Sequence, residues 1–244
     1  MRILGLVLAA ALVTAGEVNT FFDDFAKKRE GVKAVYARFT QENTTPDEIL
    51  VSEGELIYTE PRRILFRYFD PEVTYLVDGD RIYEYDADLE QLQIYDVQDQ
   101  PAIEAMFLGL DKDTSRLREA FDVELYKPLE NECGTQGLML VPKPAPEDDE
   151  SAPLFDKARI NLQDPQWLPC YVRVDNDEES YFEIKLSDFK YNNDVDLKRA
   201  FITLPEGTRI IENEQLVEKV GAGGKIVPES KPEDADLTVT VPSE

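Results

Sequence analysis

The stretch GELIYTEPRRILFRYFDPEVTYLVDGDRIYEYD, residues 54–86, decides the fold of this chain. It is predicted to form four consecutive strands joined by tight turns, because apolar and polar residues alternate between short turn sequences. Pro61 and Pro71 bound the second strand, and Asp78-Gly79 is a dipeptide that favours a two-residue hairpin turn. The chain is therefore expected to reverse direction repeatedly, as in an antiparallel sheet.

Apolar side chains occupy more faces of these strands than a sheet with one solvated face allows. In residues 64–69 one face is wholly apolar and the other is interrupted only by Arg67. The block holds aromatic residues that each cover a large apolar area: Tyr58, Phe66, Tyr68, Phe69, Tyr75, Tyr83 and Tyr85. Two interpretations remain open at this point, an ordinary sandwich core and a surface that takes up an apolar ligand.

Residues 1–15 have the pattern of a cleavable export signal. Arg2 is followed by an apolar run over residues 3–13 and by small residues suited to a signal peptidase, so cleavage is expected after Ala15. The apolar run is shorter than the about 20 residues of a membrane span, which makes an uncleaved anchor the less favoured alternative. Because the first cysteine is Cys133, no cysteine stands at the cleavage point to carry a lipid, and the mature chain is expected to be exported and soluble.

The chain contains two cysteines, Cys133 and Cys170, and no histidine. In an exported protein an even number of cysteines predicts a disulfide. Two cysteines without histidine cannot complete a zinc site, so no metal centre of that kind is expected. The acidic runs at 147–150 and 175–179 are expected to be solvated loops; calcium binding is the alternative, but neither run carries the full pattern of a calcium loop.

The formal net charge is -25, and it becomes -26 when removal of the leader takes away Arg2. Such a chain repels nucleic acid and anionic lipid head groups, so no nucleic-acid partner is expected. Residues 212–244 combine glycine, proline and many acids with no aromatic residue, and they predict a disordered acidic tail. The folded part of the mature chain is then a single domain over residues 16–211.

Two helical segments are expected beside the strands. Residues 17–29 place apolar side chains on one stripe and basic residues at the carboxyl end, and this helix should end at Gly31. Residues 101–110 form a short, strongly apolar helix that should lie against an apolar surface, and residues 113–120 add one more helical turn. With about ten or eleven antiparallel strands, the chain fits a mainly β fold, an unclosed antiparallel β-barrel covered by short helices.

The residues point to binding and away from catalysis. Without histidine, hydrolases of the Ser-His and Cys-His types are excluded, and no nucleophile elbow, phosphate loop or dinucleotide fingerprint occurs. We therefore expect no enzyme and no cofactor. A curved sheet with an apolar inner face and an apolar helical cover suits a carrier of acyl chains, because each buried methylene contributes about 0.8 kcal/mol.

Motifs in a fixed order follow the first expected helix. They are Phe39-Thr40-Gln41, Gly54-Glu55-Leu56, Pro61 with the strand Ile64–Tyr68, Pro71, Leu76-Val77-Asp78-Gly79, Tyr83–Asp86, Glu90-Gln91 and Phe201–Gly207. Over about residues 18–211 this order resembles the periplasmic outer-membrane lipoprotein carriers of the LolA family. The resemblance implies an unclosed β-barrel whose covered cavity takes lipoprotein acyl chains from an inner-membrane transporter and passes them to an outer-membrane receptor, without a cofactor or a chemical step.

The resemblance also implies which residues act. By position, Ile64, Phe66 and Tyr68 face the cavity. Strand alternation and the helical stripe add further cavity candidates: Leu56, Tyr58, Tyr75, Val77, Ile103, Met106 and Phe107. The family commonly has an arginine directly before the proline that opens the aromatic strand, where it hydrogen-bonds the lid. Here Glu60 stands in that place, and Arg62 and Arg63 just beyond it are possible lid contacts.

The resulting expectation is a monomeric carrier in the periplasm that binds the acyl chains of lipoproteins. The alternative is an exported lipid- or peptide-sensing interaction domain on the same scaffold. A dedicated sensor usually brings a further domain, and the polar tail does not resemble one, which favours the carrier. The carrier hypothesis requires a hollow between the sheet and its cover, and solid packing of Ile64, Phe66 and Tyr68 would argue against it.

Overall fold

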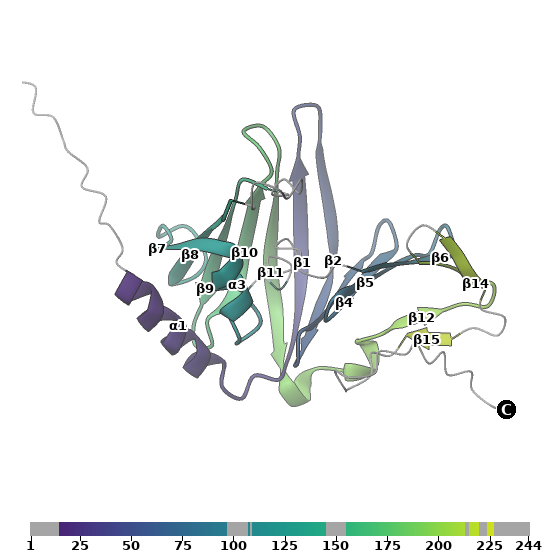
Figure 1. The fold of residues 1–244 in the computed structure, drawn as a ribbon, viewed down its shortest axis with the longest axis horizontal. Coiled ribbons are helices and arrows are strands. Elements are labelled where there is room, and N and C mark those ends of the chain that lie inside the picture. The colour runs from purple at the N-terminus through teal and green to yellow at the C-terminus, as the bar shows by residue number, and fades with distance from the viewer. Residues whose placement is uncertain are drawn as a thin grey trace, which may run out of the picture.

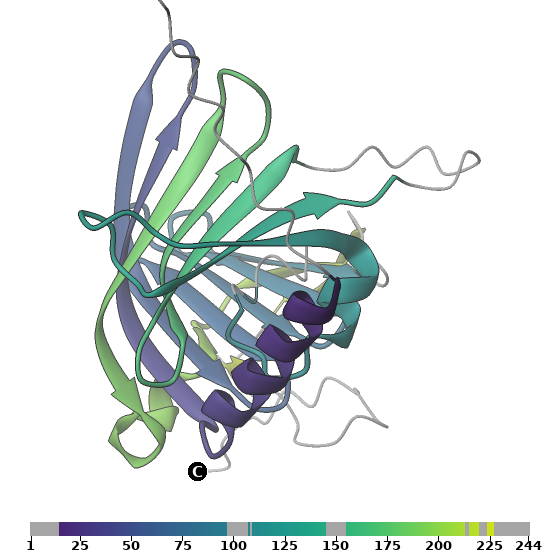
Figure 2. The ribbon, with the colours of Figure 1, turned by 90° about the vertical axis from the view of Figure 1, so that its left-hand side faces the viewer.

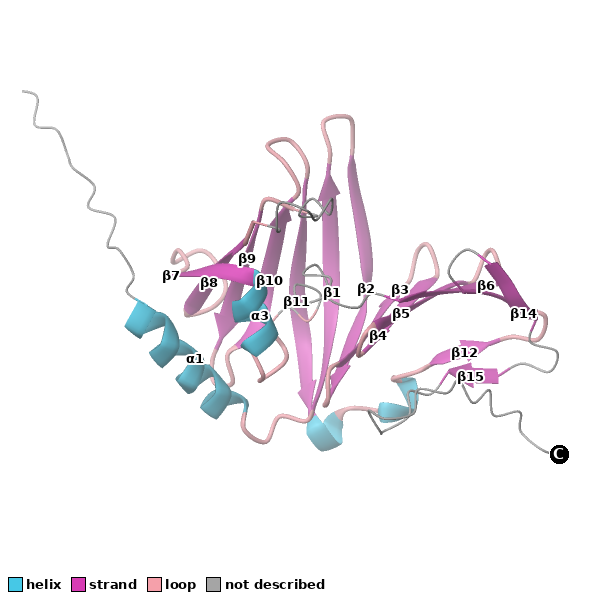
Figure 3. Cartoon of the chain, in the orientation of Figure 1, coloured by secondary structure: helices cyan, strands magenta, loops and turns pink. Residues whose placement is uncertain are grey.

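A computed structural model describes residues 15–96, 107, 109–144, 155–212, 215–219 and 224–226 of the protein. The described residues are mostly strands, with α1 (Ala15–Arg29), α3 (Ser115–Ala120) and the short 3-10 turns η1 (Asn192–Asp194) and η2 (Leu197–Arg199) (Figure 3). The predicted cavity residues Ile103 and Met106 lie outside the described residues, as does the leader up to residue 14. The expected mainly β fold with few short helices is confirmed.

One large sheet contains thirteen strands in the order β14-β13-β6-β5-β4-β3-β2-β1-β11-β10-β9-β8-β7. Its strands are β1 (Ala34–Thr44), β2 (Ile49–Thr59), β3 (Arg63–Tyr68), β4 (Val73–Asp78), β5 (Arg81–Asp86), β6 (Gln91–Asp96), β7 (Phe121–Tyr126), β8 (Gln136–Pro142), β9 (Lys157–Gln163), β10 (Leu168–Asp175), β11 (Tyr181–Tyr191), β13 (Arg209–Glu212) and β14 (Gln215–Lys219). A second sheet pairs β12 (Ile202–Leu204) with β15 (Gly224–Ile226).

The large sheet is bent and unclosed. Figures 1 and 2 show the bend between the half with β7 to β11 and the half with β3 to β6, and β1 joins them by pairing with both β2 and β11. The edge strands β7 and β14 end the order without pairing to each other. The sheet has more strands than the predicted ten or eleven, and one pairing, β13 with β6, is parallel, because the chain crosses the sheet between β11 and β13.

Helix α1 confirms the helix predicted from the apolar stripe and the basic carboxyl end. Phe21, Phe22 and Phe25 are buried, and the helix ends before Gly31, whose φ of 83° favours glycine. The Phe21 ring stacks on Trp167 with 5.0 Å between ring centroids. Helix α1 is thereby fixed to the turn that connects β9 with β10.

The two faces of the sheet carry separate apolar clusters. The inner face packs against α1, α3 and Phe107, and the outer face of β2 to β6 packs against the segment that follows β11. Val195, Ile202, Leu204 and Ile210 of that segment are all buried in the outer cluster. The aromatic block is apolar on both faces because the chain's own carboxyl-terminal segment covers one of them.

The expectation of a disordered tail needs correction for two short stretches. Strand β14 pairs with β13, and β15 pairs with β12, both beyond residue 212. Strands β13 and β12 each have an edge that no earlier strand covers. The backbone N–H and C=O groups of β14 and β15 pair with these edges, which the composition of the tail could not indicate. The division of the chain at residue 211 stays a prediction.

A disulfide joins Cys133, in the loop between β7 and β8, to Cys170 in β10. The two Cα atoms are 6.3 Å apart, and the cysteines are separated by 37 residues in sequence. The bond ties the outermost hairpin of one half of the sheet to an interior strand.

Replacing both Cys133 and Cys170 by serine is expected to lower the free energy of unfolding by roughly 3 kcal/mol, because a loop of this length then regains its freedom in the unfolded chain. Urea unfolding of the wild type and the variant under oxidising conditions measures the difference. The difference should shrink in excess reductant. If it persists there, its cause is lost packing of the buried Cys170 side chain and not loss of the bond.

Candidate functional site

The predicted cavity residues on β2, β3 and β4 lie on one face of the sheet. Register pairs place Leu56 beside Phe66 and Phe66 beside Tyr75, while the next row runs from Tyr58 through Ile64 to Val77. Together with Tyr68, and with Phe107 packed over them, these residues belong to one apolar cluster. We call the strand residues of this set the inner wall: Leu56, Tyr58, Ile64, Phe66, Tyr68, Tyr75 and Val77.

Packing varies along the inner wall. Ile64 is completely buried and Phe66 is 5% exposed, whereas Tyr68 and Tyr75 are only partly buried. The Phe39 ring of β1 meets both Phe66 and Tyr68 edge to face, at centroid distances of 6.0 and 5.0 Å. The wall is thus closely packed at Ile64 and Phe66, which argues against the expected hollow at these two residues, and it is more open at Tyr68 and Tyr75. Phe39 packs against the wall although sequence reasoning did not name it as a cavity residue.

The two tyrosines at the open end are neutral. Tyr68 donates a hydrogen bond to Gln41 Oε1 at 2.7 Å, and Tyr75 donates to Glu84 Oε1 at 3.3 Å. Burial raises the pKa of Tyr68, and burial together with the Glu84 carboxylate raises the pKa of Tyr75 to about 12. Both rings therefore present uncharged surface at neutral pH.

Helix α1 holds the chain at Gly109 and Leu110, at the end of the predicted lid. Arg29 Nη2 donates to the carbonyls of Gly109 and Trp167, both at 2.6 Å, and its Nη1 donates to the Leu110 carbonyl at 3.3 Å. Arg29 is 1% exposed. Sequence reasoning assigned this arginine only to the helix dipole, and no local signal indicated the carbonyls that it reaches, which lie 80 to 138 residues away.

The turn between β2 and β3 holds the same segment through charge pairs. Arg62 Nη1 lies 3.1 Å from Asp111 Oδ2, and its guanidinium lies 4.4 Å from the centroid of the Phe107 ring. Lys112 Nζ lies 2.7 Å from Glu60 Oε1. We call Phe107 and residues 109–112 the anchored segment. Glu60 stands in the place of the family arginine and also contacts this segment, but its charge is negative where that of the arginine is positive.

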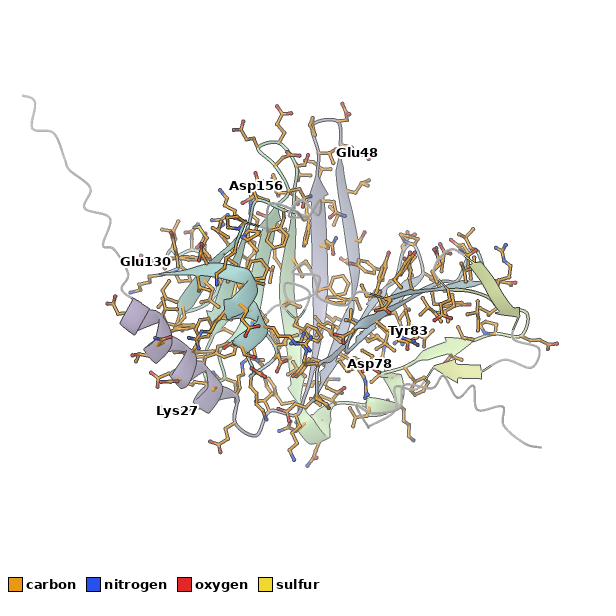
Figure 4. All side chains as sticks on the ribbon, viewed as in Figure 1. Lys27, Glu48, Asp78, Tyr83, Glu130 and Asp156 are labelled. Atoms are coloured by element: carbon orange, nitrogen blue, oxygen red, sulfur yellow. A yellow bond between two sulfur atoms is a disulfide. The ribbon has the colours of Figure 1, made fainter. Side chains whose placement is uncertain are left out.

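Of the two arginines proposed as lid contacts, Arg62 contacts the anchored segment in the part of the chain that the structure describes. Arg63 Nε instead lies 3.3 Å from Asp78 Oδ1 of the neighbouring strand; Asp78 is labelled in Figure 4. Arg62 belongs to the turn and has a φ of 46°, whereas Arg63 is the first residue of β3. These different backbone positions separate the contacts of two arginines that the sequence alone made equivalent.

Replacing Arg62 by glutamine is expected to loosen the anchored segment, because a charge-assisted hydrogen bond and a cation–π contact are lost together. Hydrogen exchange of the Leu110 to Lys112 amides should become at least about tenfold faster. The matched control is Arg63→Gln, which removes the same charge one residue away and should leave those amides unchanged. Equal acceleration in both variants would contradict the assignment.

The outer face carries a separate polar network beside a half-open hollow of about 430 Å³, whose wall includes Arg67, Tyr85 and Ile202. The Glu55 carboxylate, 1% exposed, is paired with both Arg67 and Arg199. Arg67 Nη2 also donates to the carbonyls of Arg199 and Phe201. This network binds the segment after β11 to the sheet, on the face opposite to the inner wall.

Two further properties bear on function. Among the described residues, no group of three or more acidic, cysteine or histidine side chains is placed to hold a metal ion. None of the described helices has the length and apolar character needed to span a membrane. The features that remain are the inner wall and the anchored segment packed over it.

Comparison with known proteins finds relatives that are outer-membrane lipoprotein carrier proteins. The sequence model described as outer membrane lipoprotein carrier protein LolA matches residues 30–203. An outer-membrane lipoprotein carrier protein of Halorhodospira halophila is 26% identical over 215 residues, which cover 87% of this chain and 93% of the relative. One of Alkalilimnicola ehrlichii is 25% identical over 211 residues, covering 84% and 87%.

Among solved structures, a LolA superfamily protein from Nitrosomonas europaea is similar over 75% of this chain and 95% of its own, with 10% identity and a TM-score of 0.38. This low score adds nothing to the sequence matches. Those matches cover well over half of the chain, and the bent, unclosed sheet agrees with them. The chain belongs to the LolA family of outer membrane lipoprotein carrier proteins.

Proposed function

We propose that this protein is a periplasmic carrier that binds the acyl chains of lipoproteins over the inner wall and moves them from the inner to the outer membrane. The observation that carries the proposal is the inner wall itself, a continuous set of aliphatic and aromatic side chains on one face of three strands, in a chain of this family. The leader predicted at residues 1–15 supports export of the chain.

An apolar wall is sufficient for this task. Acyl chains offer no polar groups along their length, so binding depends on area removed from water, at about 0.8 kcal/mol for each methylene. A long chain then contributes on the order of 10 kcal/mol without a directed hydrogen bond. The partly buried rings of Tyr68 and Tyr75 mark the end of the wall at which a chain would gain most contact.

Carriage also requires release, and the anchored segment is suited to reversible closure. It is tied down by two ion pairs and by carbonyl hydrogen bonds, and its displacement also uncovers the buried side chains of Phe107 and Leu110. We propose that loading and unloading displace this segment at an inner-membrane transporter and at an outer-membrane receptor. The action is binding and transfer, with no chemical step.

Native mass spectrometry of protein purified from its own periplasm tests the proposal. We expect a species with bound lipoprotein, and acyl probes that compete with it. Protein that is empty and also refuses acyl probes would overturn the carrier function. Protein that takes acyl probes but never lipoprotein would support instead an exported lipid-sensing domain on the same scaffold.

A further inference from the structure

Two buried polar atoms beside the inner wall have no hydrogen-bond partner among the described residues. They are Arg29 Nε and the Tyr58 hydroxyl, on residues that are each 1% exposed. A buried polar group without a partner costs about 1 to 3 kcal/mol, and more when it carries charge. Because proteins leave few such groups unpaired, two of them on one apolar face indicate that something else pairs with them.

The remaining nitrogen atoms of Arg29 are committed to carbonyl oxygens, and its guanidinium lies 4.7 Å from the centroid of the Phe25 ring. No carboxylate of the described residues forms an ion pair with it, since Asp111 is taken by Arg62. Burial lowers the pKa of Arg29 to about 9, so the group is protonated at neutral pH. Three of its five N–H donors are thus used, and Nε is the nitrogen atom of this buried cation that has no acceptor.

The surroundings of Tyr58 are apolar along the sheet. Its register neighbours are Val35 on β1 and Ile64 on β3. Burial raises the pKa of Tyr58, with Asp111 and Glu60 adding to it, while the positive charge of Arg29 acts in the opposite direction. The hydroxyl therefore keeps its proton and can donate a hydrogen bond.

Arg29 Nε can only donate, and the Tyr58 hydroxyl can donate as well as accept, so a single acceptor can satisfy both groups. We infer that Arg29 Nε and the Tyr58 hydroxyl form a polar anchor for an oxygen acceptor at the head of a bound acyl chain, either the carbonyl of an ester or amide or the oxygens of a carboxylate. The inference rests on the proposed function, because it takes the acyl chain to lie along the inner wall. The anchor fixes which end of the chain faces α1.

Three probes of equal chain length separate the head group from the chain: decanoate, methyl decanoate and decyltrimethylammonium. Their dissociation constants are measured by displacement of a fluorescent acyl probe from the wild type and from Tyr58→Phe. The variant keeps the ring and loses one donor. We expect its affinity for the acceptor-bearing probes to fall about tenfold, with the affinity for decyltrimethylammonium unchanged.

The matched control is Tyr171→Phe, on β10 and outside the inner wall. The Tyr171 hydroxyl already has Glu183 as its partner, so its removal should leave all three affinities within about twofold. Without probe, Tyr58→Phe should unfold at a urea concentration equal to or above that of the wild type, since a buried unpaired hydroxyl is lost. This measurement separates a binding defect from a folding defect.

The arms of the experiment distinguish the sources of the acceptor. A loss confined to decanoate identifies a free fatty acid, and a loss that includes methyl decanoate identifies the ester or amide of a lipidated molecule. If Tyr58→Phe leaves both acceptor-bearing probes bound as in the wild type, the polar anchor is wrong while the carrier function stands. If the wild type binds none of the three probes, the carrier function itself fails.

Discussion

Replacing Phe66 by glutamate is expected to weaken acyl-chain binding at least about 100-fold. The ring lies at the centre of the inner wall between Leu56 and Tyr75, and a carboxylate there would have to lose its water to let a chain pack on it. The free energy of unfolding should fall as well, because Phe66 also contacts Phe39. Displacement of a fluorescent acyl probe measures the first effect and urea unfolding measures the second.

The control for this variant is Leu65→Ala. Leu65 neighbours Phe66 on the same strand, is equally buried and belongs to the outer cluster. Its truncation should cost about 2 to 5 kcal/mol of stability and leave acyl binding intact. At the more exposed Tyr68, glutamate should repeat the binding defect with a smaller loss of stability. Equal binding losses at Leu65 and Phe66 would show that the effect is not specific to the inner face.

Replacing Glu55 by glutamine is expected to lower the free energy of unfolding by about 2 to 4 kcal/mol. The carboxylate is buried and serves both Arg67 and Arg199, so its loss leaves two guanidinium groups facing a neutral amide. The value lies toward the lower part of the range for broken buried pairs, because the Arg199 side chain is 48% exposed and water screens it. Urea unfolding with a fluorescence readout measures the change.

The matched control is Glu53→Gln, two residues earlier on the same strand and on the same face, where the side chain is exposed. That change should alter stability by less than about 0.5 kcal/mol. Acyl binding should survive Glu55→Gln in the folded fraction, since the network lies on the outer face. A cost below about 1 kcal/mol would mean that the two arginines find other partners and that the network does not hold the carboxyl-terminal segment.

The strands and α1 could be predicted because alternation and helical periodicity are patterns among residues that are close in sequence. Alternation at residues 64–69 placed β3 within a residue of its observed ends, and the stripe with Gly31 placed α1. The same alternation assigned the inner wall to one face. Periodicity could not explain why the outer face is also apolar. Residues 195–210 cover that face, and they are distant in sequence from the strands.

The contacts of the arginines were beyond sequence reasoning for a related reason. Arg29 is one of three consecutive basic residues at the end of a helix, and Lys27, labelled in Figure 4, forms a local pair with Asp24. Burial of Arg29 follows from its place on the helix face that meets the sheet. The parallel pairing of β13 with β6 likewise could not be predicted. It requires the chain after β11 to cross the outer face of the sheet, and no local sequence pattern indicates that crossing.

Strand β1 has a particular consequence for how the molecule can flex. It is the only strand shared by the two halves of the described sheet, and its register with β11 shifts between Tyr36 and Arg38. Irregularities of this kind interrupt a ladder and let a strand change direction. The angle between the two halves can therefore change at this irregularity while the hydrogen-bonded ladders on either side stay intact.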